Sequence, residues 1–222
     1  MDRTRSRDYG PGMLSLRENG RLSVLKMLVA ANVAVFLFES LLTPMGQIRM
    51  DAIFGLSMRG ISHGMLWQFV THQFLHGSLF HLLVNMLGLW FAGRILENLL
   101  GGRRFLLFYL ACGICGGVFQ LILSPGPTLI GASGAVCGVI AAFSAVYPEM
   151  PITALLFFVL PIRMRAKWLG RLIVIISVFL IVTRLMGDIG NAAHLGGALA
   201  GYAIVWLGKQ KLRRPGSVTP SP

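Results

Sequence analysis

Six long apolar stretches constrain this sequence more than any other feature. A helix needs about 20 mostly apolar residues to cross the hydrocarbon core of a bilayer, and six runs in the chain come close to that length. They cover residues 23–42, 79–97, 103–123, 131–147, 168–186 and 191–208. Only 13% of the residues are charged, about half of what a soluble domain carries. We therefore expect an all-α, polytopic membrane protein built as a bundle of six transmembrane helices.

A further apolar segment, ITALLFFVL at 152–160, is bracketed by Pro151 and Pro161 and has only nine residues. It is too short for a crossing, so we expect a re-entrant or interfacial segment there. The basic residues support this count. With six crossings and a cytoplasmic N-terminus, 17 of the 20 Lys and Arg residues lie on the cytoplasmic side, in accord with the positive-inside rule. A seventh crossing would place the basic C-terminal stretch KQKLRR outside.

The same pattern predicts three parts: a basic cytoplasmic tail at 1–22, a membrane domain at 23–208, and a basic, Pro-containing cytoplasmic tail at 209–222. We expect an integral protein of the bacterial plasma membrane, because the chain shows no extra domain and no transit peptide. The net charge of +12 is expected to set the orientation and to contact anionic lipid. Nucleic-acid binding is not expected, because no basic stripe is interleaved with exposed aromatic residues.

Polar residues that membrane helices rarely hold mark the starts of three predicted crossings. They are Gly-Ala-Ser-Gly at 131–134, His194 with Gly197 and Gly201 after it, and the run WQFVTHQFLHGSLFHLLVN at 67–85. The second, fourth and sixth crossings all begin on the outer side, so we expect these residues to share one depth below the outer surface. His81 and Asn85 are four residues apart and therefore project from one helix face.

These residue types suit nucleophilic catalysis. A serine that attacks needs a base, and histidine is the usual one. Glycines beside Ser133 leave its hydroxyl uncrowded, and the amide of Asn85 could donate to a developing oxyanion. A structural interpretation stays open, because small residues commonly pack membrane helices, and His81 and Asn85 could simply bond one helix to another. Ionisable groups within a membrane nevertheless point to function by default.

In this order and on six crossings, the HGSLFHLLVN run, the G-A-S-G and the A-H-x-x-G-x-x-x-G at 193–201 resemble the rhomboid intramembrane serine proteases. The resemblance covers about residues 67–208. It implies a dyad without Asp, in which Ser133 is the nucleophile and His194 the general base. The substrates would be transmembrane proteins in the bilayer, cleaved in or near a transmembrane segment. No cofactor or metal is implied.

The resemblance also assigns supporting roles. His81 and Asn85 match the positions that stabilise the oxyanion, together with the Ser133 N–H. His76 matches a structural histidine of the outer loop, and Glu97 a structural acidic residue. The glycines with structural roles are Gly131, Gly134, Gly197 and Gly201, the last two packing the sixth helix on the fourth.

Two positions depart from the family pattern. Gln68 stands where some members have Arg, so we expect a lipid-facing Arg contact to be missing. Cys137 stands four residues after Ser133, where the family often has a Tyr that stacks on the catalytic histidine. His194 must therefore be held in another way. Two other functions stay open: a proteolytically inactive relative that binds transmembrane clients, and a small transporter.

Overall fold

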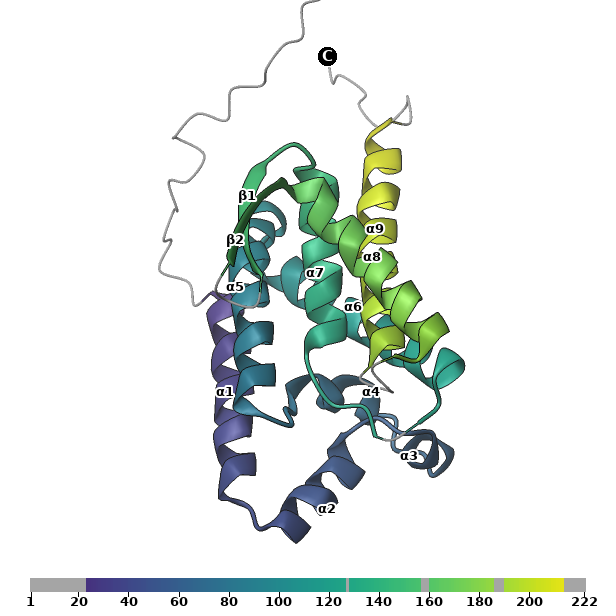
Figure 1. The fold of residues 1–222 in the computed structure, drawn as a ribbon. Helices are drawn as coiled ribbons and strands as arrows, with labels where there is room; N and C mark the ends of the chain where they lie inside the picture. The colour runs from purple at the N-terminus through teal and green to yellow at the C-terminus, as the bar shows by residue number, and fades with distance from the viewer. Residues whose placement is uncertain (1–22, 127, 157–159, 186–189, 214–222) are drawn as a thin grey trace, which may run out of the picture.

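Six long helices build the protein, which we describe from a computed structural model at residues 23–126, 128–156, 160–185 and 190–213 (Figure 1). They are α1 (Val24–Leu41), α5 (Leu79–Leu100), α6 (Gly102–Leu123), α7 (Ser133–Val146), α8 (Ala166–Thr183) and α9 (Asn191–Arg213). Each coincides with one predicted apolar run. Among the described residues, α1, α5, α6 and α8 are long and apolar enough to cross a membrane, and α7 is a shorter apolar helix.

The prediction of an all-α polytopic membrane protein is confirmed. The start of α1 and the end of α9 lie at the same end of the bundle, whereas α5, α7 and α9 all begin at the opposite end (Figure 1). We call the first end the hairpin end, because a pair of antiparallel strands lies there. We call the second end the site end, because the helices that carry the predicted site residues begin there. The predicted tail at 1–22 and residues 214–222 of the other predicted tail lie outside the described residues.

Glu97 fixes the start of α1 at the hairpin end. Its carboxylate accepts hydrogen bonds from the Ser23 hydroxyl and the Val24 N–H, each at 2.6 Å, and from the Leu25 N–H at 3.3 Å. These backbone donors have no partner within their own helix, and a carboxylate also complements the positive end of the helix dipole. The acidic residue predicted to be structural therefore ties α5 to α1.

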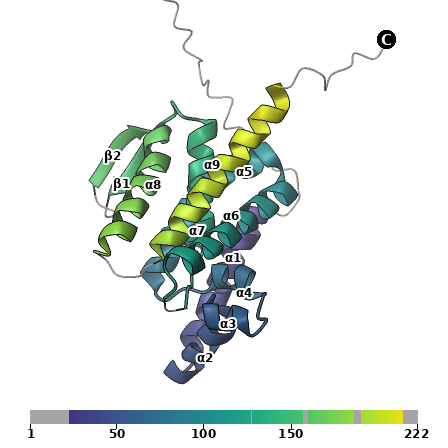
Figure 2. The ribbon, with the colours of Figure 1, turned by 90° about the vertical axis from the view of Figure 1, so that its right-hand side faces the viewer.

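α7 lies at the centre of the bundle and packs against α5, α6, α8 and α9 (Figures 1 and 2). Its apolar side chains Ala135, Val136, Val139 and Phe143 belong to the buried core. The helix has 14 residues, so it is about 21 Å long, shorter than the hydrocarbon core of about 30 Å. If α7 ends at one surface of that core, Ser133 at its start lies below the other surface.

Two paired strands, rather than a helix, follow α7 in the described part of the chain. Strand β1 (Pro151–Leu156) pairs antiparallel with β2 (Leu160–Arg165), and Thr153 lies opposite Arg163. Ile152 and Met164 also pair, and both pack on the core of the bundle. The described parts of the segment predicted to be re-entrant or interfacial therefore belong to paired strands, which lie beside α8 (Figure 2).

Short helices fill the long connection between α1 and α5 at the site end (Figure 1). They are α2 (Pro44–Phe54), α3 (Met58–Ser62), α4 (Gln68–Thr71) and the 3₁₀ helix η2 (His72–Phe74). Leu56 in this connection forms an isolated β-bridge with Leu129, four residues before Ser133. The connection therefore holds the loop that leads into α7.

Candidate active site

Ser133 and His194 meet at the site end. Ser133 is the first residue of α7 and His194 the fourth of α9. The distance between His194 Nε2 and Ser133 Oγ is 2.8 Å, within the range that joins a nucleophile to its base. For the hydroxyl to donate its proton to Nε2, the proton of the neutral imidazole must be on Nδ1. The structure thus brings together the two residues that the sequence singled out for nucleophilic chemistry.

Close backbone contact between α7 and α9 makes this distance possible. A Cβ atom on Gly197 would collide with the carbonyl group of Gly134, and one on Gly201 would collide with that of Gly138. Gly134 and Gly197 are the immediate neighbours of the dyad, one residue after Ser133 and three after His194. Any side chain at Gly197 would separate the two helices at the point where the dyad forms. Gly197 and Gly201 therefore both lie where α9 contacts α7.

Gly131 shapes the turn before Ser133. Its φ of 123° lies in the region that L side chains rarely adopt. A Cβ atom there would also lie 2.6 Å from Cε1 of His81. The Gly131 N–H donates to the His72 carbonyl at 2.8 Å. Both the backbone conformation and the contact with His81 therefore require glycine at this position.

His81 and Asn85 lie on the first turns of α5. The His81 ring lies against Gly131, next to the residues that lead into Ser133. Asn85 is buried, and its Nδ2 donates to the His81 carbonyl at 2.9 Å. An amide nitrogen carries two hydrogens, so this bond leaves a second N–H for another acceptor. α5 also packs on α7, where Gly88 lies against Val136.

The Ser133 N–H faces no acceptor in the described part of the chain. The first N–H groups of a helix have no intrahelical partner, and together with the helix dipole they favour negative charge. α7 therefore presents unpaired donors next to the Ser133 hydroxyl.

His76 connects this region to α1. Its backbone N–H donates to Glu39 Oε2 at 3.2 Å, and its ring meets that of His81 edge-on, with centroids 5.0 Å apart. Burial and the neighbouring His81 lower the pKa of His76 to about 4, although the hydrogen bond to the Phe74 carbonyl raises it. His76 is therefore neutral at physiological pH and supports His81 through contact.

His72 and Gln68 organise the outer connection, and both lie in the polar run at 67–85 that the sequence singled out, although neither was assigned this role. The buried His72 ring donates from Nδ1 to the Gln68 carbonyl at 2.7 Å, and burial lowers its pKa to about 4. Gln68 is fully buried; its side chain accepts from the Ser57 N–H and donates to the Ala52 carbonyl. The side chain at this position therefore holds the connection from within rather than facing outward.

Gln120 was also missed, although it is a lone amide in an otherwise apolar run. Its Oε1 accepts the N–H of Ala193, the residue directly before His194, at 3.2 Å.

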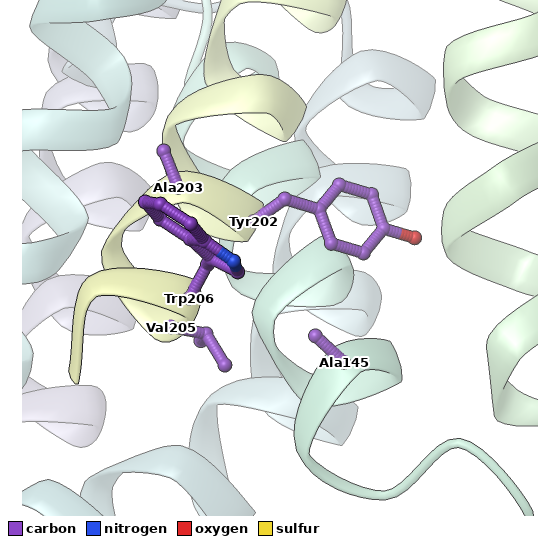
Figure 3. A pocket seen from close by; sticks show the side chains of 5 residues that line it. All are labelled: Ala145, Tyr202, Ala203, Val205 and Trp206. Carbon is purple, nitrogen blue, oxygen red and sulfur yellow. The ribbon is translucent and has the colours of Figure 1, made fainter. Parts of the chain in front are cut away.

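An apolar cavity of about 410 Å³ lies away from Ser133 and His194 (Figure 3). Its lining residues are Ala145, Tyr202, Ala203, Val205 and Trp206. Ala145 is twelve residues beyond Ser133, which places it about 18 Å along α7.

Residues 63–211 match the Rhomboid domain family. This chain belongs to the rhomboid family. The matched range contains every residue predicted for the site, whereas α1 precedes it.

Curated relatives share this rhomboid region. "Rhomboid protease GluP" of Bacillus subtilis (strain 168) is 31% identical over 188 residues, which are 83% of this chain and 34% of that protein. "Putative rhomboid protease YdcA" of the same organism is 27% identical over 197 residues, 86% of this chain and 91% of that protein. "Rhomboid protein 1, mitochondrial" of Saccharomyces cerevisiae is 35% identical over 157 residues, 65% of this chain and 44% of that protein. This rhomboid thus spans about a third of the first relative and nine-tenths of the second.

Proposed function

We propose that this rhomboid is an intramembrane serine endopeptidase that hydrolyses peptide bonds in or near transmembrane segments of membrane proteins. The observation that carries the proposal is the 2.8 Å contact between His194 Nε2 and Ser133 Oγ. Two relatives whose names include "rhomboid protease" support it. The short α7 supports the choice of substrate, because its 14 residues do not span the hydrocarbon core, and a nucleophile at its start would then lie within the depth of a transmembrane substrate.

Acylation begins when Ser133 Oγ attacks the carbonyl carbon of the scissile bond. The hydroxyl proton passes to His194 Nε2, and the carbonyl oxygen becomes an oxyanion. The unpaired Ser133 N–H at the start of α7 and the free amide hydrogen of Asn85 are the donors we assign to that oxyanion, with His81 beside them. His194 then gives its proton to the leaving amine as the C–N bond breaks.

Deacylation repeats the same steps with water. His194 accepts a proton from the water that attacks the acyl carbon. It returns that proton to Ser133 Oγ as the second tetrahedral intermediate collapses and the ester C–O bond breaks, which releases the carboxylic acid product. Among the residues that the structure describes, no carboxylate forms a hydrogen bond with the His194 ring. The close contact between Gly134 and Gly197 holds Ser133 and His194 at hydrogen-bond distance during both acylation and deacylation.

The direct test compares purified wild type with Ser133→Ala and His194→Ala on a model transmembrane substrate. Each substitution is expected to abolish cleavage, and the double variant to be no worse than either single one, because nucleophile and base act as a unit. A fluorophosphonate probe is expected to label wild type but not Ser133→Ala. Ser144→Ala is the matched control, since Ser144 is buried in the same helix and donates only to the Ile140 carbonyl.

The proteolytically inactive alternative gives a different result. Wild type would then bind the transmembrane substrate as tightly as Ser133→Ala does, and neither would cleave it. Probe labelling that persists in Ser133→Ala would identify another nucleophile.

We further propose that both termini are cytoplasmic and that the membrane is a bacterial plasma membrane. Reporters fused after Leu100 and after Met164 are expected to read cytoplasmic, and one fused after Gly55 external. An external signal after Met164 would contradict this orientation.

A further inference from the structure

Gln120 joins the end of α6 to the start of α9. Its side chain is buried. Oε1 accepts the Ala193 N–H at 3.2 Å, and Nε2 donates to the Ser124 carbonyl at 3.0 Å. One turn earlier in α6, Gly116 lies against the Ala193 carbonyl oxygen, which a Cβ at Gly116 would approach to 2.7 Å. Helix α6 therefore contacts both polar groups of the residue directly before His194.

The chemistry of this contact requires an amide. Ala193 lies in the first turn of α9, where backbone N–H groups have no intrahelical acceptor, and the Ser124 carbonyl follows the last turn of α6. A glutamine side chain offers an acceptor and a donor at once, whereas an apolar side chain offers neither. One side chain therefore satisfies polar backbone groups at both helix ends.

The His194 ring forms few hydrogen bonds that could fix its position. Within the described residues, Ser133 Oγ is the only hydrogen-bond partner of its ring. Residue 137, one turn beyond Ser133, is a cysteine, which is too small to cover the imidazole. The backbone of His194 is held by its N–H bond to the Gly190 carbonyl at 3.1 Å and by the anchoring of Ala193. Position and tilt of the imidazole thus depend on where the first turn of α9 lies.

We propose that Gln120 is a positioning residue for the reaction. By fixing the first turn of α9 against α6, it sets the distance between His194 Nε2 and Ser133 Oγ without touching either atom. The inference rests on the proposed protease function. The anchoring of Ala193 by Gln120 would also hold the base in place where residue 137 is not aromatic.

The test measures kcat, KM and melting temperature for wild type and Gln120→Met, a substitution that keeps an unbranched side chain of similar length. Loss of the anchor lets α9 shift, and a displacement of about 1 Å between reacting groups can cost about 10²-fold in rate. We expect kcat and the rate of fluorophosphonate labelling to fall together by about 10- to 100-fold, with KM within about twofold of wild type. Gln120→Asn, whose amide is one methylene too short to bridge both helix ends, covers the case that Gln120→Met does not fold, and should lose kcat in the same way.

Asn32→Leu is the matched control for removing a buried amide. Asn32 is fully buried in α1 and donates to the Leu28 carbonyl of its own helix, so its loss should change the melting temperature and leave kcat intact. If a folded Gln120 variant keeps wild-type kcat and labelling rate, with or without a lower melting temperature, Gln120 is only structural and the inference is wrong. Wild type that neither cleaves nor labels would instead contradict the proposed function.

Discussion

Substituting Gly197 by Ala should separate the dyad with a single methyl group. A Cβ atom at Gly197 would lie 2.6 Å from the Gly134 carbonyl carbon and 3.1 Å from its Cα. Carbon atoms pack at about 3.5–4.0 Å, so α7 and α9 must move apart by about 1 Å at this level. The two contacting residues are next to Ser133 and three residues beyond His194, so the movement acts directly on the Oγ to Nε2 distance.

The size of the effect follows from that distance. An increase of about 1 Å from 2.8 Å would leave the pair beyond hydrogen-bond range, and such a misplacement can reduce the rate about 10²-fold. Overpacking a tight contact also costs about 1–3 kcal/mol of stability. We therefore expect Gly197→Ala to lower kcat about 100-fold and to lower the melting temperature measurably.

Cleavage of a model transmembrane substrate and thermal unfolding should be measured on the same preparations. Gly208→Ala is the control, because it lies on the same helix and a Cβ there would meet no described atom within 4 Å. Alanine is about 1 kcal/mol more favourable than glycine within a helix, so the control should be as active as wild type and at least as stable. Wild-type kcat in Gly197→Ala would refute the view that backbone contact between α7 and α9 sets the dyad distance.

Three further substitutions test other parts of the structure. Asn85→Ala should lower kcat by up to about 10²–10³-fold with little change in KM; normal kcat with a lower melting temperature would remove Asn85 from the oxyanion site. Glu97→Ala should cost about 1–3 kcal/mol, because charged hydrogen bonds to the start of α1 are lost, while kcat per folded molecule stays constant at the distant site end; thermal unfolding and cleavage check both. Burial lowers the pKa of His72 to about 4 from 6.5. As the pH falls, the unfolded chain therefore binds a proton at this residue before the folded protein does. The contribution of His72 should lower the free energy of unfolding by about 1.4 kcal/mol per pH unit between pH 6.5 and 4. Melting temperatures of wild type and His72→Gln at pH 7.5 and 5 measure this, and an equal loss in both would exclude His72 as a source.

The helices and their order could be predicted from the sequence, because the requirement behind them is local. A bilayer demands about 20 mostly apolar residues for each crossing, and six runs come close to that length. Six crossings also place the starts of α5, α7 and α9 at one end, so the number of crossings alone assigns Ser133 and His194 to the same end of the bundle. Polar residues at those helix starts could be singled out from the sequence, because ionisable groups within a membrane are costly and by default indicate a functional site.

Residues that act through distant partners were harder to find. The hairpin was missed because its second strand carries Arg163 and Arg165, beyond the apolar window, and strand pairing is decided by a partner rather than by a local run. Gln120 and His72 were missed or undervalued for a similar reason. One partner of Gln120 is a backbone N–H 73 residues away, and the His72 carbonyl accepts the Gly131 N–H. A sequence pattern does not reveal which backbone group a buried residue will reach.

Only the tertiary structure determines the distance on which the proposed chemistry depends. The residue types and their common depth follow from composition and crossing number, and both are properties of single segments in a bilayer. The 2.8 Å between His194 Nε2 and Ser133 Oγ instead depends on how closely two separate helices pack. Gly134 and Gly197 allow that approach, and the hydrogen bond from Ala193 to Gln120 anchors the first turn of α9. Packing this close is the combined result of many contacts between segments far apart in the chain, which no local pattern in the sequence encodes.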